Sequence, residues 1–281
     1  MMPKITKKMV TITKYPESIS SNSSGSTVTF GDMHGNTMKL LWNLIQEGVI
    51  KIGSQEFDQM WKAYRDNNVK DFIDLIGNIE VVRHDLNVRL IGDVFADRGQ
   101  NDYFTLKVLE KLHQGGVKPE IIYSNHDIWL LGDYKKKAES WDVVRFNTEY
   151  NSNQGRSGGN LLKLIEKDGD PTLESVRGLI DAYVIPSMKV ISYSLSEDRS
   201  KISLFIHAPN VLGRIKDLAQ ELGVSWPKEG NPESAVELAK IIDEINLKFD
   251  EIRTKNLQDY EEIMKIGGKG GEETTITKNM N

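Results

Sequence analysis

Apolar, β-prone runs alternate with amphipathic segments through the first half of the chain. We expect strands at residues 28–30, 88–91, 120–123 and 203–206. Apolar residues at helical spacing predict helices over residues 36–48, 55–77 and 102–112. Each of the expected strands ends in a short polar segment, and a helix follows the first of them directly. Alternation of strands and helices in this way predicts a layered α/β fold.

The pattern changes after residue 134. Residues 134–187 are mostly helical and polar in pattern, and we interpret them as a helical insertion near the site. Residues 188–195 and 201–206 predict a hairpin, and helical spacing returns from residue 211 to about residue 265. The expected organisation has five parts: a flexible lead-in (1–26), a core (27–215) that contains the insertion (134–187), a helical extension (216–265) and a disordered tail (266–281).

Composition narrows the class of protein. The chain has 281 residues, a net charge of −5 and no cysteine. The charge gives no general attraction to nucleic acid. Without cysteine there are no disulfides, thiolate metal sites or cysteine nucleophiles, which excludes enzymes that use a catalytic cysteine. No apolar run reaches membrane-spanning length, and no apolar segment follows the N-terminal lysines, so we expect no membrane span, no Sec export and a cytoplasmic location.

Residues that can bind a metal follow four of the expected strands. Asp32 and His34 lie two apart in a turn bounded by glycines, so both side chains can face one point. The other strands lead into Asp93 and Asp97-Arg98, into Asn125-His126-Asp127, and into His207. Ligands collect outside the carboxyl ends of strands in open α/β sheets, and carboxylate oxygens with imidazole nitrogens suit a divalent metal.

These four segments, in this order, resemble the calcineurin-like metallophosphoesterases. The order is Asp-x-His, Gly-Asp…Asp-Arg-Gly, Asn-His-Asp and His-Ala, and it spans residues 28–210. It is most similar to the phosphoprotein phosphatase branch, whose pattern is GDxHG, GDxxDRG, GNHE and a later histidine. It also resembles bacterial effector phosphatases of this branch that are delivered into host cells. The resemblance implies a four-layer sandwich, in which two central mixed sheets are flanked by helices.

The resemblance also implies a site with two divalent metals. Asp93 matches the family's bridging aspartate. Asp32 and His34 would complete the first metal site, and Asn125 and His207 would bind the second metal. Manganese is the expected metal, with iron or zinc as alternatives.

Three further side chains match catalytic or substrate-binding positions of the family. His126 matches the histidine that protonates the leaving oxygen, and Asp97 matches the acid that orients it. Arg98 matches the guanidinium that holds the phosphate oxygens, and we expect Asn125 to contact the substrate as well.

Structural roles are the alternative for several of these residues. Asp32 could cap the following helix, Asp97 and Arg98 could form a surface ion pair, and Asn125 could be a turn residue. His207 could be a hydrogen-bonded core histidine.

The sequence departs from the family pattern at three points. Asp93 and Asp97 are four apart, one more than in the family, so either the loop bulges or the geometry between Asp97 and His126 shifts. Ser124 replaces the glycine before Asn125, and Asp127 replaces the usual glutamate. No histidine follows His207, although the family supplies one more to the second metal: either the protein continues beyond this sequence, or another residue substitutes, or the second metal is bound weakly. The second phosphate-binding arginine has three candidates: Arg145, Arg156 and Arg214.

We therefore predict a metal-dependent phosphomonoesterase that acts on phosphorylated Ser, Thr or Tyr side chains through a metal-activated water. The alternatives are a dinucleoside-polyphosphate hydrolase or phosphodiesterase of the same fold, and a degenerate binding module without activity. The expected partner is a phosphorylated protein or peptide. The insertion and the C-terminal helices are candidate surfaces for a protein partner.

Overall fold

The computed structural model describes residues 10–31, 33–127, 130–131, 155–168, 171–207, 212–228, 230–255, 268–269 and 272–273. A four-stranded sheet lies at the centre of these residues. Its spatial order is β1 (Thr27–Gly31), β4 (Asn87–Ile91), β5 (Glu120–Ile122) and β6 (Met188–Lys189). All neighbouring strands in this sheet are parallel. Their carboxyl ends therefore meet at one edge.

Apolar side chains aligned across the strands explain the register. Phe30 lies opposite Leu90, Leu90 opposite Ile121, and Ile121 opposite Met188. All four side chains are buried, in a row that crosses the sheet. A one-residue slip of any strand would turn its apolar set to the other face, so this row fixes the register.

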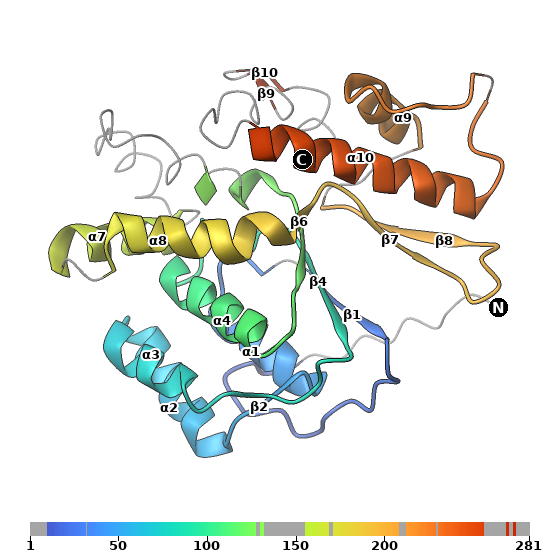
Figure 1. Ribbon diagram of the computed structural model, residues 1–281. Helices are drawn as coiled ribbons and strands as arrows, with labels where there is room; N and C mark the ends of the chain where they lie inside the picture. Colours follow the sequence, from blue (N-terminus) through green and yellow to red (C-terminus); the bar gives the residue numbers. More distant parts are fainter. Residues whose placement is uncertain are drawn as a thin grey trace.

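Helices α1 (Thr37–Gln46) and α4 (Asp102–Gln114) lie on one side of the sheet (Figure 1). Each begins after an asparagine whose side-chain oxygen accepts a backbone N–H: Asn36 for α1 and Asn101 for α4. Caps of this kind satisfy amide groups that the first helical turn leaves without partners. They place the starts of both helices directly after the polar segments that follow β1 and β4.

The helix predicted over residues 55–77 is two helices, α2 (Ser54–Arg65) and α3 (Val69–Ile76). Asn67 interrupts them with a positive φ of 50°, and Asn68 caps α3 by accepting the N–H of Asp71. Asparagine is among the few residues that tolerate the left-handed region, so these two asparagines favour a turn. Strand β2 (Ile50–Lys51) precedes these two helices in the chain and β3 (Glu80–Val81) follows them, and the two strands pair antiparallel.

The predicted hairpin is present, but with different bounds. β7 (Ser192–Leu195) pairs antiparallel with β8 (Ile202–Phe205), and α10 (Ala235–Lys255) packs against both strands (Figure 1). Residues 188–189, predicted as part of the hairpin, belong to the parallel sheet as β6. The chain changes sheets at residues 190–191, where Asn246 of α10 accepts the N–H of Val190 and donates to the carbonyl of Ile191.

A buried arginine joins the hairpin to the parallel sheet. Arg89 of β4 donates to Ser192 Oγ (2.8 Å) and to the carbonyl of Tyr193 (3.0 Å), and its guanidinium lies 4.1 Å from the ring centroid of Phe205. It is also paired with Glu120 at 3.2 Å. A buried charge is tolerated when it is hydrogen-bonded and paired in this way.

The remaining elements are mostly helical. α7 (Arg156–Asp168) and α8 (Leu173–Leu179) pack against α4, and α8 continues into a π-helical turn (Ile180–Val184) and a 3₁₀ turn (Ile185–Ser187). α9 (Leu212–Glu221) contacts α10. Within residues 266–281 the structure describes only the short pair β9 (Gly268–Lys269) and β10 (Glu272–Glu273).

One expectation needs correction in the described residues. The central sheet is parallel instead of mixed, and in place of a second central sheet the described residues show the two-stranded β7–β8 hairpin. Part of the predicted flexible lead-in lies against the core: the Tyr15 hydroxyl donates to the carbonyl of Ile52, and Trp42 donates to the carbonyl of Lys14. Aromatic side chains thus attach a segment whose composition predicts a loop.

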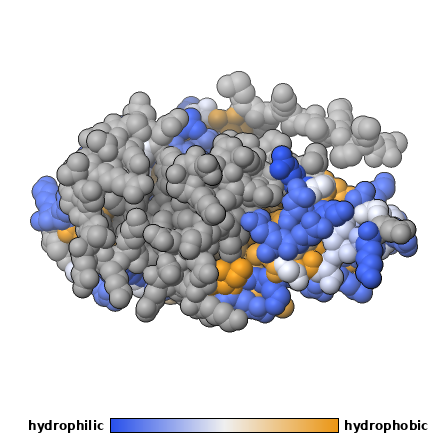
Figure 2. Space-filling model, turned by 90° about the horizontal axis from the view of Figure 1, so that it is seen from above, coloured by the Kyte–Doolittle hydropathy of each residue, from blue (hydrophilic) through white to orange (hydrophobic). Residues whose placement is uncertain are grey.

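The upper face of the molecule is mainly hydrophilic in its described part, with small hydrophobic groups between the polar residues (Figure 2). None of the helices in the described part of the chain has both the length and the apolar character needed to cross a lipid bilayer.

Candidate active site

The site lies where the strands end. His34 is in the turn between β1 and α1, and Asp93, Asp97 and Arg98 are in the loop between β4 and α4. His126 is in a helical turn after β5, and His207 follows β8 of the hairpin. Three non-glycine residues of these segments have positive φ: His34 (53°), Asp93 (51°) and Ala96 (52°). Backbone strain of this kind clusters at functional sites, where the surrounding structure maintains it.

Asp93 lies between two histidines. Its Oδ2 is 3.7 Å from His34 Nδ1, and its Oδ1 is 3.3 Å from His207 Nε2. Oδ1 is buried and accepts no hydrogen bond within the described part of the chain. A buried carboxylate oxygen without a donor is costly, and two imidazoles directed at the same carboxylate are the surroundings of a bridging ligand.

His207 is held with one ring nitrogen directed at Asp93. Its Nδ1 lies 3.2 Å from the carbonyl of Ile91, which can only accept, so Nδ1 carries the proton and Nε2 faces Asp93. Metal-binding histidines commonly donate their second ring nitrogen to a backbone carbonyl in this way. Gly92 makes room for the ring: it has a φ of +66°, and a Cβ there would lie 2.7 Å from His207 Cγ.

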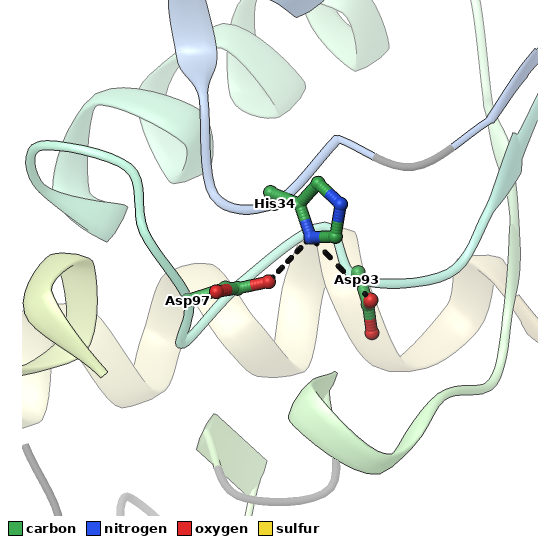
Figure 3. Close-up of side chains that lie close together, drawn as sticks. All are labelled: His34, Asp93 and Asp97. Carbon is green, nitrogen blue, oxygen red and sulfur yellow. Dashed lines mark hydrogen bonds and ion pairs between the residues drawn. The ribbon is translucent and has the colours of Figure 1, made fainter. Parts of the chain in front are cut away.

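Asp97, His34 and Arg98 form a second group of contacts. His34 Nδ1 lies 2.5 Å from Asp97 Oδ2, and Arg98 Nη2 lies 2.8 Å from His34 Nε2. Figure 3 shows the His34 ring between the carboxylates of Asp93 and Asp97. One ligand atom from each of these three residues lies within 4.8 Å of the other two, so together they could hold a metal ion.

His126 is oriented mainly by a backbone carbonyl. Its Nδ1 donates to the oxygen of Ala96 at 2.8 Å, and its Nε2 lies 3.9 Å from Asp97 Oδ2. Ala96 precedes Asp97 in the loop that is one residue longer than the family pattern. The carboxylate of Asp97 is closer to His34 than to His126, so the lengthened loop gives the Asp97–His126 pair a wider spacing than a direct hydrogen bond.

Two buried acids hold the loop after β4. Asp127 Oδ1 accepts the backbone N–H groups of Val94 (2.9 Å) and Phe95 (3.0 Å), and Asp102 Oδ2 accepts that of Ala96 (2.9 Å). Burial raises the pKa of Asp127 to about 8 and that of Asp102 to about 7. Ser124 completes this set, because its Oγ accepts the N–H of Asp93 at 2.9 Å and donates to Asp127. Each of these amides thus has a side-chain acceptor in place of a partner in a helix or strand.

The other predicted residues are placed as follows. Asn125 is half-buried and stands beside His126 at the start of the helical turn. Asp32 and Arg145 lie outside the described residues. Arg214 is exposed on α9, whereas the Arg156 guanidinium donates to the carbonyls of Arg98 (2.5 Å) and Gly99 (3.0 Å).

Sequence reasoning missed the residues that support the site. Asp127 was visible only as a variant of the family's GNHE pattern, and Asp102 only as the first residue of a helix. Ser157 had no signal in the sequence: its contacts with Asp97 join residues that are 60 positions apart.

Comparison with known proteins identifies the family. The model of the WipA-like phosphatase domain matches residues 87–276, which is more than half of the chain. The chain belongs to this family. The matched span contains Asp93, Asp97 and Arg98 together with the segments that carry His126 and His207. The protein is therefore a phosphatase, and the prediction of an enzyme is confirmed.

A solved structure of related sequence agrees with this assignment. The crystal structure of the phosphatase domain from the Legionella effector WipB has a TM-score of 0.74 and 26% sequence identity to this chain. The similarity covers 91% of this chain and 92% of that one. A search of curated proteins finds no significant match.

Proposed function

We propose that this WipA-like phosphatase is a metal-dependent phosphomonoesterase of the calcineurin-like type, acting on phosphorylated Ser, Thr or Tyr side chains. The observation that carries the proposal is the position of Asp93. Its carboxylate lies between His34 and His207, and its buried Oδ1 accepts no hydrogen bond from the described residues. A divalent cation on each side of the carboxylate would supply the missing partner.

The donor set fits two such cations. His34 and Asp93, with Asp32, offer two carboxylates and an imidazole to one cation. His207 and Asn125 offer an imidazole and an amide oxygen, with Asp93, to the other. Oxygen and imidazole ligands suit manganese, iron or zinc. When bound, the pair of metals would supply an activated water and neutralise charge on the phosphoryl oxygens.

His126 is suited to transfer a proton at Nε2. Its Nδ1 is committed to the carbonyl of Ala96, so Nε2 is the ring nitrogen that can exchange a proton with the leaving oxygen. Asp97 Oδ2 lies 3.9 Å from this nitrogen. Positioned general acids of this type accelerate reactions by about 10²–10⁴-fold.

Arg98 is suited to bind the phosphate group. Its side chain is about half exposed, at 54%, while its Nε is paired at 3.2 Å with Asp97, which is 2% exposed. The buried carboxylate thus orients a guanidinium that still reaches solvent. A planar guanidinium can bind two phosphate oxygens at once.

The similarity to the phosphatase domain of the Legionella effector WipB supports a biological setting for this chain. We infer that this protein also acts as a bacterial effector inside a host cell, on host phosphoproteins. The match to phosphatase domains favours this function over the non-catalytic binding module, and also over the diesterase alternatives.

The decisive experiment replaces the bridging carboxylate. Asp93→Asn should lose bound metal and activity together, because a neutral amide cannot bridge two cations. Metal content is measured by elemental analysis. The hydrolysis rate is measured with p-nitrophenyl phosphate and with a phosphopeptide panel at a fixed Mn²⁺ concentration. Asp58→Asn, the same change at an exposed position of α2, serves as control and should keep both. Wild-type metal content and rate in Asp93→Asn would remove Asp93 from the bridge.

A further inference from the structure

The segment that carries Asp97 and Arg98 depends on a distant helix for its hydrogen bonds. Ser157, near the start of α7, donates its N–H to the carbonyl of Asp97 (2.9 Å) and accepts the N–H of Asp97 on Oγ (3.0 Å). Ser157 is fully buried, so nothing in solvent replaces these contacts when they are lost.

Two other side chains of α7 bind the next three carbonyl groups. Arg156 donates to the oxygens of Arg98 (2.5 Å) and Gly99 (3.0 Å), and Asn160 donates to that of Gln100 (2.6 Å). Every carbonyl from Asp97 to Gln100 is therefore held by α7. None of these four residues is in a helix or strand, so the conformation of the segment is set by these contacts.

Close backbone packing joins the same helix to the turn that carries His34. A Cβ at Gly35 would lie 2.6 Å from Ser157 Oγ, and a Cβ at Gly99 would overlap the carbonyl of Gly35. Gly35 and Gly99 thus allow three segments to pack closely together: the turn after β1, residues 97–100 and the first turn of α7. A shift of α7 would be transmitted to Arg98 and His34 together.

We propose that the first turn of α7, formed by Arg156, Ser157 and Asn160, is a positioning element for Asp97 and Arg98. It orients the phosphate-binding arginine and the acid beside His126, and it does not itself touch the substrate. Arg156, a candidate for the second phosphate-binding arginine, therefore acts on the loop backbone. This inference rests on the proposed function of Asp97 and Arg98.

The test measures kcat and KM for Ser157→Ala, Arg156→Ala and Arg156→Lys with p-nitrophenyl phosphate. Displacing reacting groups by about 1 Å can lower rates about 10²-fold, so we expect kcat to fall about 10- to 100-fold in both alanine variants. KM should change less, by about threefold or less, and Arg156→Lys should recover part of the rate because lysine can still donate to a carbonyl. Ser175→Ala removes a hydroxyl that bonds the carbonyl of Thr172 at the start of α8, away from the site, and should keep the wild-type rate.

A double-mutant cycle separates positioning from direct contact. If Ser157 and Arg156 act partly through Arg98, their alanine variants should lower kcat by a smaller factor in an Arg98→Ala background than in wild type, because residues in one network are not additive and only the effect on Asp97 remains. Equal losses in both backgrounds would overturn the proposal. The inhibition constant for inorganic phosphate provides a second measurement. If Arg156→Ala raises this constant by the same factor in the wild-type and Arg98→Ala backgrounds, Arg156 binds the substrate directly instead.

Hydrogen exchange provides a readout that does not depend on activity. Amides of residues 97–100 should exchange faster in Ser157→Ala than in wild type, and at the wild-type rate in Ser175→Ala. Unchanged exchange in Ser157→Ala would refute the positioning role. If the wild-type protein has no phosphatase activity with any added metal, the proposed function is refuted. The exchange result would still show whether Ser157 holds residues 97–100.

Discussion

Gly92→Ala is the substitution that connects backbone geometry to the site most directly. Gly92 has a φ of +66°, and an added Cβ would lie 2.7 Å from His207 Cγ and 2.8 Å from Ser124 Cβ. Gly223 has nearly the same φ, +69°, with no heavy atom within 4 Å of an added Cβ. The two substitutions therefore share the backbone strain, and only the first also displaces neighbours.

The expected loss can be divided into these two parts. A left-handed residue with a Cβ costs about 1–2 kcal/mol, and Gly223→Ala should lose about this much stability. At Gly92 the His207 ring must move by about 1 Å to restore an ordinary contact of about 3.5 Å. That movement breaks its hydrogen bond to the carbonyl of Ile91, which is worth about 0.5–1.5 kcal/mol. Gly92→Ala should therefore lose about 1.5–3.5 kcal/mol.

Activity separates the two variants more clearly than stability. Displacement of His207 moves Nε2 away from Asp93 Oδ1, now 3.3 Å away, so kcat/KM should fall by about 10²-fold or more. Gly223→Ala should keep its activity. Urea unfolding and p-nitrophenyl phosphate hydrolysis measure both quantities on the same samples. Equal stability losses in the two variants, together with wild-type activity in Gly92→Ala, would refute the geometry assigned to His207.

Two further predictions concern His126 and Asp102. His126→Asn should retain its metal and lower kcat about 10²–10⁴-fold on phenyl phosphate. The loss should be much smaller on p-nitrophenyl phosphate, because its leaving group needs little protonation. Equal losses on the two substrates would contradict a role of His126 as general acid. Burial raises the pKa of Asp102 from 3.8 to about 7, so the folded protein binds this proton more tightly than the unfolded chain does, and the stability that it contributes is lost as the pH rises from about 4 through 7. Asp102→Asn should remove this pH-dependent loss of stability. The unfolding free energy of the variant minus that of wild type should therefore rise by up to about 1.4 kcal/mol per pH unit between about pH 4 and 7. If that difference is the same at every pH, Asp102 does not titrate in this range.

The sequence predicted those parts of the fold that depend on local pattern. The apolar runs at residues 88–91 and 120–123 correspond to β4 and β5, and their parallel pairing brings Asp93 near the segment that carries His126. His207 was expected from a fourth strand of the same kind, and residues 201–206 were also predicted to form a hairpin with residues 188–195. Its strand, β8, does belong to an antiparallel hairpin, and Arg89 holds that hairpin against the sheet. The pattern did not predict that residues 188–189 pair with β5 in the parallel sheet.

The supports of the site could not be predicted, because they depend on contacts between distant segments. Asp127 accepts two amides more than 30 positions before it, and Ser157 binds an amide 60 positions before it. A serine or aspartate in a polar segment has no pattern that distinguishes such a role from a solvated one. The metal-capable residues were easier to identify because short motifs contain them.

The lengthened loop after β4 shows how a site can tolerate a change in loop length. Six successive amides, from Asp93 to Arg98, each donate to a side-chain oxygen, so the loop needs no partner strand to fix its path. The acceptors come from the turn after β5, from α4, from α7 and, for Arg98, from Asp97 itself. Two residues of the loop, Asp93 and Ala96, are in the left-handed region, and the carbonyl of Ala96 accepts a hydrogen bond from His126. In this loop the carbonyl of Ala96 thus orients His126, while the carboxylate of Asp97 lies beside His34.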